Sequence, residues 1–283
     1  MIFTNYIRFC PLIWFTLIFG SYAYDLSERL EPKGALKVRL DHDLAITWPN
    51  RLKKKGKQIR RTFLWSTHLK FMNPVSEIND GQLWQMADDA YKEMQAEQKL
   101  YGVNSKKDTP KAISILAFGN EIIISSTIKG MKPFAYEYKK SAVSATLQKC
   151  QSDWAEAGGS ADQRHKNQGG CSEVMSAQLY YSIYSKDDNP LSGRNARICA
   201  VVAVGDSPAE RENPCGTDRT RLQDIWGCNK FVAEEGLDDI DKTIDAESYD
   251  LSTLAGGIDT IDQIQICEAS ESESESGKQD SKS

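Results

Sequence analysis

The strongest constraint on the fold is a pair of β-branched segments separated by only two residues. The segments Ala112–Phe118 (AISILAF) and 121–128 (EIIISSTI) flank Gly119 and Asn120. Two strands around a Gly-Asn turn are typical of a β-hairpin, because these residues accept the backbone angles of tight hairpin turns. We therefore expect the sheet of this protein to open with a hairpin.

The segments around the hairpin alternate between helical and extended patterns. Apolar residues from Leu83 to Met94 recur at intervals of three and four, which predicts a helix that Asn79 or Asp80 caps. Further helices are expected over residues 141–154, from Cys171 and from Cys228. The apolar run 197–205 predicts a central strand covered on both faces, and a last strand is expected over 261–267. This order predicts an α/β three-layer sandwich, with a mixed sheet and helices on both faces.

The two ends of the chain differ from the body. Residues 1–23 contain a short apolar stretch followed by Ser21 and Ala23, a pattern typical of a cleaved signal peptide rather than a membrane anchor. We therefore expect a secreted, extracellular protein without a transmembrane anchor. Residues 268–283 form an acidic Ser/Glu tail that we expect to be disordered. The domain itself is expected to span residues 79–267.

Residues 24–78 are predicted to form a partly irregular N-terminal segment. It contains seven basic residues between positions 51 and 61. Such a run is typical of a flexible solvated segment, and it could also contact phosphate groups or anionic lipids. The pair Arg60 and Arg61 could instead mark a processing site.

The charge balance follows the same division. The whole chain has a net charge of -5, but residues 233–283 contain 15 acidic and 3 basic side chains, a net of -12. The remainder is a mildly basic body. A charge balance of this kind is compatible with a nucleic-acid or nucleobase ligand but does not by itself identify one.

Six cysteines remain once the expected signal peptide is removed: Cys150, Cys171, Cys199, Cys215, Cys228 and Cys267. In an oxidising compartment, disulfides are the usual interpretation of an even number. Cys150 and Cys267 are a candidate bridge, and Cys199, within an apolar strand, is expected to pack as a small hydrophobic residue. Metal ligation is the competing interpretation for the other three.

Those three cysteines lie at helix starts. Cys171 follows Gly169 and Gly170 and precedes Glu173 by two residues, and Cys215 follows Pro214. Helix N-termini stabilise thiolates, which zinc binds readily. A glutamate in the first helical turn could move protons beside a metal without binding it.

These residues resemble the cytidine-deaminase-like superfamily, including its secreted toxin-type members. The order of helix, hairpin, Cys-x-Glu helix, strand and Pro-Cys before another helix is similar over about half of the chain, residues 80–236. The superfamily signature is His-or-Cys-x-Glu followed by Pro-Cys-x-x-Cys. The resemblance implies that Cys171, Cys215 and Cys228 bind zinc and that Glu173 is the catalytic acid/base. The implied reaction is hydrolytic deamination of a nucleobase.

The sequence departs from this signature between the last two cysteines. Twelve residues separate Cys215 from Cys228, where the family has two. A loop would have to fold back, or His165 would replace Cys228 as a ligand, or the site would lack metal and serve binding only. We therefore expect a secreted, monomeric effector or toxin-like protein, a candidate zinc-dependent deaminase. The alternative is a non-catalytic effector or binding protein stabilised by disulfides.

Overall fold

A computed structural model describes residues 24–48, 61–130, 133–205, 207–217 and 224–267. The expected signal peptide, the acidic tail and all of the basic run except Arg61 lie outside the described residues. The described part is a mixed α/β structure with six α-helices and an eight-stranded sheet. No helix among the described residues is both long and apolar enough to cross a membrane.

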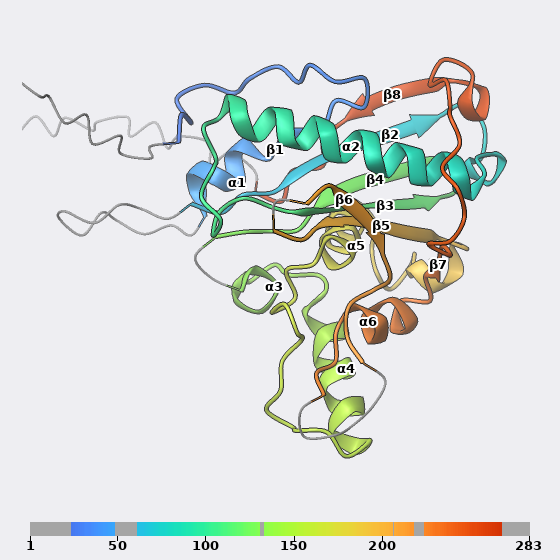
Figure 1. Cartoon of the computed structure of the whole chain (residues 1–283). Coiled ribbons are helices and arrows are strands. Elements are labelled where there is room, and N and C mark those ends of the chain that lie inside the picture. The colour runs from blue at the N-terminus through green and yellow to red at the C-terminus, as the bar shows by residue number, and fades with distance from the viewer. Residues whose placement is uncertain (1–23, 49–60, 131–132, 206, 218–223, 268–283) are drawn as a thin grey trace, which may run out of the picture.

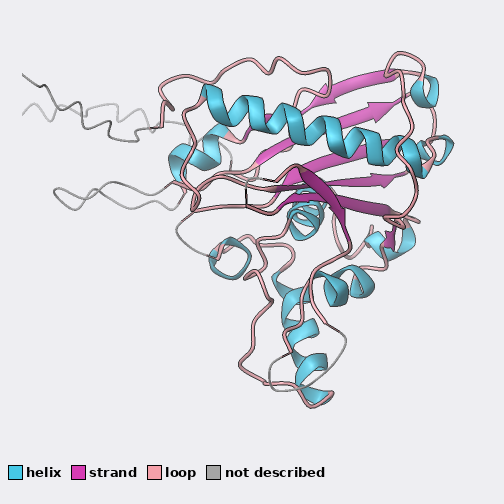
Figure 2. Cartoon of the chain, in the orientation of Figure 1, coloured by secondary structure: helices cyan, strands magenta, loops and turns pink. Residues whose placement is uncertain are grey.

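The sheet is antiparallel except for one pair of strands. Its strands, labelled in Figure 1 and magenta in Figure 2, follow the order β1-β2-β4-β3-β5-β6, with β8 paired to β2 and β7 paired in parallel to β5. The strands are β1 (Arg39–Leu40), β2 (Trp65–Phe71), β3 (Ala112–Phe118), β4 (Glu121–Ser126), β5 (Arg197–Ala203), β6 (Ala209–Glu212), β7 (Asp238–Asp239) and β8 (Ile258–Asp262). The hairpin of β3 and β4 is therefore confirmed, but the expectation that it opens the sheet is wrong: β1 and β2 precede it in the chain, and it lies in the middle of the sheet.

The helices confirm most of the sequence prediction. They are α1 (His42–Thr47), α2 (Asp80–Leu100), α3 (Phe134–Glu137), α4 (Ser144–Glu156), α5 (Ser172–Ile183) and α6 (Cys228–Glu234) (Figure 1). Asn79 caps α2, because its side chain accepts the backbone N–H of Gln82.

Alternate residues of the hairpin enter two separate apolar clusters. In β3, Ile113 and Ile115 pack in the cluster that contains the apolar side of α2. Leu116 and Phe118 pack with α4, α5 and α6 in the other cluster. Alternation along a strand sends neighbouring side chains to opposite faces, so every residue of β3 is buried.

Residues 24–78 contribute more regular structure than the sequence pattern indicates. They form β1, α1 and β2, and β2 pairs with β4 along five residues. Strand β2 contains His68 and Lys70, which interrupt its apolar pattern and hide it from a sequence reading. The buried ring of His68 has a polar partner there, because its Nε2 lies 2.6 Å from a carboxylate oxygen of Glu121 on β4.

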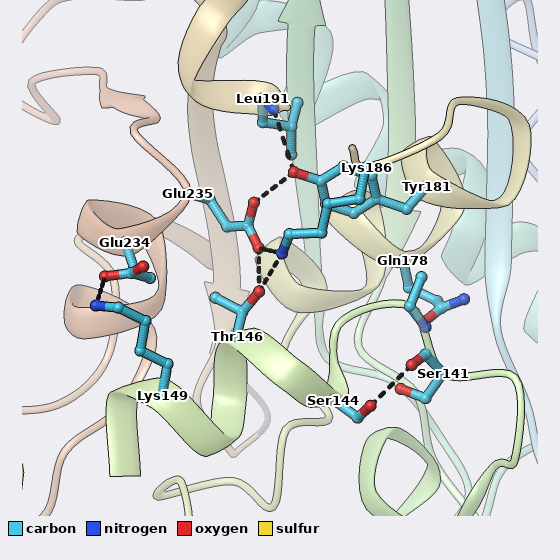
Figure 3. Close-up of polar contacts among 11 residues, drawn as sticks. Ser141, Ser144, Thr146, Lys149, Gln178, Tyr181, Lys186, Leu191, Glu234 and Glu235 are labelled. Atoms are coloured by element: carbon cyan, nitrogen blue, oxygen red, sulfur yellow. Dashed lines mark hydrogen bonds and ion pairs between the residues drawn. The ribbon is translucent and has the colours of Figure 1, made fainter. Parts of the chain in front are cut away.

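A buried polar network joins the helices of the second cluster (Figure 3). Glu235, directly after α6, accepts 2.6 Å hydrogen bonds from Thr146 of α4 and Tyr181 of α5. Lys186 forms a 2.8 Å ion pair with the same carboxylate. These contacts hold α6, whose first residue is Cys228, against α4 and α5.

Candidate metal centre

Four potential ligands converge where α5 and α6 begin. The side-chain ligand atoms of His165, Cys171, Cys215 and Cys228 all lie within 4.8 Å of one another. The three cysteines expected to bind zinc are therefore close together, and His165, the alternative ligand, lies with them. Cys171 directly precedes α5 as its N-cap, and Cys228 is the first residue of α6.

The described ends of the segment that joins Cys215 to Cys228 lie against each other. The backbone N–H of Asn229 donates to the carbonyl of Cys215 over 2.9 Å. A Cβ atom at Gly227 would lie 2.8 Å from the Cys215 sulfur, so only glycine permits this approach. Gly216 has a φ of 119°, which also favours glycine. The twelve-residue spacing is thus accommodated by a close contact between two backbone segments.

The distances between the ligand atoms suit a small tetrahedral ion. The sulfurs of Cys171 and Cys215 are 3.6 Å apart, and the Cys228 sulfur is 3.4 Å from His165 Nε2. Two sulfur ligands of a tetrahedral zinc ion, each about 2.3 Å from it, would lie about 3.8 Å apart. The residues present therefore fit zinc in both chemistry and spacing.

None of the six described cysteines forms a disulfide. The bridge expected between Cys150 and Cys267 is not formed. Cys150 is buried on α4, whereas the Cys267 sulfur lies 3.9 Å from the Tyr138 hydroxyl. Cys199 packs in the first apolar cluster, as expected.

Hydrogen bonds among the thiols concentrate negative charge on one sulfur. Donation from Cys171, followed by donation from Cys228, holds the pKa of the Cys215 thiol far below its usual range. The same contact with Cys215 raises the pKa of Cys171, and burial raises that of Cys228. The lowered pKa favours the thiolate form of Cys215, which is the form that binds metals.

Asn167 is a polar contact of this cluster that sequence reasoning missed. Its side-chain Nδ2 lies 3.1 Å from the Cys171 sulfur and 3.5 Å from the Cys215 sulfur, and donates to both. The residue belongs to a tight turn in which Gln168 and Gly169 have positive φ angles. The Gly-rich loop indicated a turn there, but nothing in a single sequence singles out this asparagine.

The orientation of the His165 ring distinguishes it from the cysteines. The backbone N–H of Asn167 donates to Nδ1 of His165 over 3.1 Å. Burial lowers the pKa of the imidazole to about 4, so the ring is neutral near pH 7. A neutral ring with an accepting Nδ1 carries its proton on Nε2, and we assign that proton as a donor to Cys228.

Glu173 lies in the first turn of α5 beside the cluster. Its side chain is buried, and Ser172 Oγ donates to it over 3.0 Å. Burial, together with the nearby charge of Cys215, raises the pKa of Glu173 to about 7. Such a carboxyl group can both give and accept a proton near neutrality.

A cavity of about 530 Å³ opens onto one side of this centre. Cys171, Cys215 and Glu173 line it, whereas His165 and Cys228 do not. Its walls come from the start of β3, the residues after β4, the end of β5 and the loop that contains Cys215. A ligand in the cavity would therefore contact the glutamate and two of the three cysteines.

Comparison with protein-family models, with curated proteins and with solved structures finds no match.

Proposed function

We propose that this chain is a secreted effector or toxin-like protein that deaminates a nucleobase by zinc-dependent hydrolysis. The observation that carries the proposal is the convergence of Cys171, Cys215 and Cys228 beside the buried Glu173 at the wall of a cavity. These are the residues to which the cytidine-deaminase-like pattern assigns metal binding and proton transfer.

The order of the elements supports the resemblance. Helix α2 precedes the β3–β4 hairpin, α5 starts after Cys171, β5 follows, and Cys215 leads to α6. We interpret α2 on one apolar cluster and α4, α5 and α6 on the other as the outer layers of a three-layer sandwich. The cavity then lies where the start of β3 and the ends of β4 and β5 meet the start of α5.

Three thiolates would hold zinc and leave one position for a ligand. A histidine that binds zinc through Nε2 carries its proton on Nδ1 and donates it to a neighbour. His165 Nδ1 instead accepts a hydrogen bond, which favours a role as donor to the Cys228 sulfur. An open coordination position is the property that separates catalytic from structural zinc sites.

Glu173 is suited to proton transfer in this arrangement. A bound zinc ion would supply a water that is nucleophilic near neutral pH. Glu173 would accept a proton at its carboxylate and return it to the nitrogen that leaves as ammonia. Its burial and its position in the first turn of α5 keep the carboxyl group at the cavity wall.

A closed structural zinc site is the second candidate. All four ligand atoms lie within 4.8 Å of one another, and the 3.4 Å separation of Cys228 Sγ and His165 Nε2 also fits a four-ligand site. In that case the domain would be a non-catalytic binding protein, and the only role of Glu173 would be to stabilise the N-terminus of α5 through its negative charge.

Two variants separate these candidates. Glu173→Gln should retain one zinc per chain and the wild-type melting temperature, while deamination of pyrimidine and purine probes falls at least about 100-fold. His165→Ala should retain zinc if three cysteines hold it, and should lose zinc if the site is closed. Zinc is measured by elemental analysis of the purified protein. Absence of zinc from the wild-type protein, or full deamination by Glu173→Gln, would contradict the proposal.

A further inference from the structure

The cavity beside the metal centre carries an excess of positive charge. Four lysines line it, Lys111, Lys129, Lys166 and Lys242, against two glutamates, Glu173 and Glu212. This balance stands out in a chain whose net charge is -5. Cavities lined by one sign of charge raise the local concentration of ligands of the opposite sign.

Two of these lysines already have partners. The Lys111 ammonium donates to the carbonyl of Gly205, and the Lys242 ammonium lies 3.6 Å from a Glu212 oxygen. The positive charges of Lys111 and Lys242 are therefore partly compensated by groups of the protein itself.

The other two lysines have no partner among the described residues. No hydrogen bond or ion pair joins the ammonium group of Lys129 or Lys166 to another described side chain or carbonyl. Their backbones are nevertheless held. Lys129 exchanges two backbone hydrogen bonds with Phe63, and the Lys166 N–H donates to Trp226 over 2.9 Å. Two uncommitted cations are thus attached to fixed backbone at one cavity.

We propose that Lys129 and Lys166 bind phosphate, so that the substrate is a phosphate-bearing form of the nucleobase rather than a free base or nucleoside. This inference rests on the proposed function, because the cavity also contains Glu173 and the metal ligands. Lysine is a common phosphate ligand, acting as a point charge. A volume of about 530 Å³ suits a ligand of nucleotide size.

A mononucleotide and a single-stranded nucleic acid offer the same phosphate chemistry. Binding of the zinc-loaded protein is therefore compared for three probes of the same base: cytidine, cytidine 5′-monophosphate and a short fluorescent single-stranded oligonucleotide. The same series with adenosine covers purines. Preference for the mononucleotide indicates a terminal phosphate, and preference for the oligonucleotide indicates a phosphodiester backbone.

The double variant Lys129→Gln/Lys166→Gln provides the test. It should weaken binding of the preferred phosphate probe at least about tenfold at low salt, with zinc content, melting temperature and nucleoside binding unchanged. The matched control Lys99→Gln/Lys107→Gln removes the same charge from exposed positions outside the cavity lining, and should bind like the wild type.

Three results would overturn the inference. The first is that nucleosides bind as tightly as both phosphate probes. The second is that Lys129→Gln/Lys166→Gln binds the phosphate probe as tightly as the wild type. The third is that the control Lys99→Gln/Lys107→Gln weakens binding of the phosphate probe by the same factor. Each can occur in a protein that contains zinc and depends on Glu173, so failure here is distinguishable from failure of the proposed function. Loss of zinc or of Glu173 dependence would instead reject the function itself.

Discussion

At the scale of single residues, Glu97 of α2 is a buried acidic group. Its side chain is 3% exposed, and neither carboxylate oxygen has a hydrogen-bond partner among the described residues. Burial raises the pKa of Glu97 from 4.5 to about 7. Between these two values the folded state binds more protons than the unfolded state, so its stability falls as pH rises through that window.

Replacing this carboxylate should remove the pH dependence that it causes. Relative to wild type, Glu97→Gln should be more stable at pH 8 by about 2 kcal/mol, and the difference should shrink toward zero near pH 4.5. Urea unfolding at the two pH values measures this. The exposed Glu28→Gln is the control and should show no such change. An equal effect of Glu97→Gln at both pH values would contradict the assignment.

Glu234 is the last residue of α6 and Glu235 follows it, and replacing each should destabilise the fold to a different degree (Figure 3). Glu235→Ala leaves Thr146, Tyr181 and Lys186 without their shared acceptor and should cost about 3 kcal/mol of unfolding free energy. Glu234→Ala removes only the exposed pair with Lys149 and should cost less than about 1 kcal/mol. Similar losses in the two variants would show that the buried network is not the cause.

At the scale of elements, the loop that joins Cys215 to α6 decides whether the centre can form. Gly227→Ala would place a methyl group 2.4 Å from the Cys215 carbonyl oxygen, so the loop must move away from α6. We expect zinc affinity to fall at least about tenfold and stability to fall by about 2 kcal/mol. Competition with a fluorescent zinc chelator measures the affinity.

Gly193→Ala is the matched control for that loop. A Cβ atom at Gly193 meets no atom within 4 Å, and we expect wild-type zinc affinity. Unchanged affinity in Gly227→Ala would show that the close approach of the two segments does not determine metal binding.

The sequence indicates the local elements well but not their long-range partners. The Gly119-Asn120 turn, the cap at Asn79 and the helix starting after Cys171 are all determined by neighbouring residues, and each is confirmed. Strand β2 was missed because it pairs with β4, more than 50 residues later, and with β8, nearly 200 residues later. Register between such distant segments depends on packing, which no local pattern contains.

The same limit applies to the site. Cys171 and Cys228 could be selected from their places at helix starts, Cys215 from its place after Pro214, and His165 from its residue type. Their proximity depends on the contact between Gly216 and Gly227, which no spacing rule reveals. The donor role of Asn167 follows from the turn geometry alone.

At the scale of the whole molecule, metal binding should stabilise the domain as a unit. An ion bound only by the folded state adds its binding free energy to folding. Removal of zinc by a chelator should lower the melting temperature by about 5–10 °C, and added zinc should restore it. Cys228→Ser should melt at the lower temperature with or without chelator. Identical melting of the chelated and loaded wild-type protein would argue against a bound ion.

The positions of the ligands along the chain add a topological effect to that stabilisation. Cys171 and Cys215 are 44 residues apart, and Cys215 and Cys228 are 13 apart. A single ion bound at this centre would therefore hold two successive loops closed as long as the domain is folded. A bound ion of this kind would limit how far these two loops open before they close again, and so would slow their cleavage by proteases.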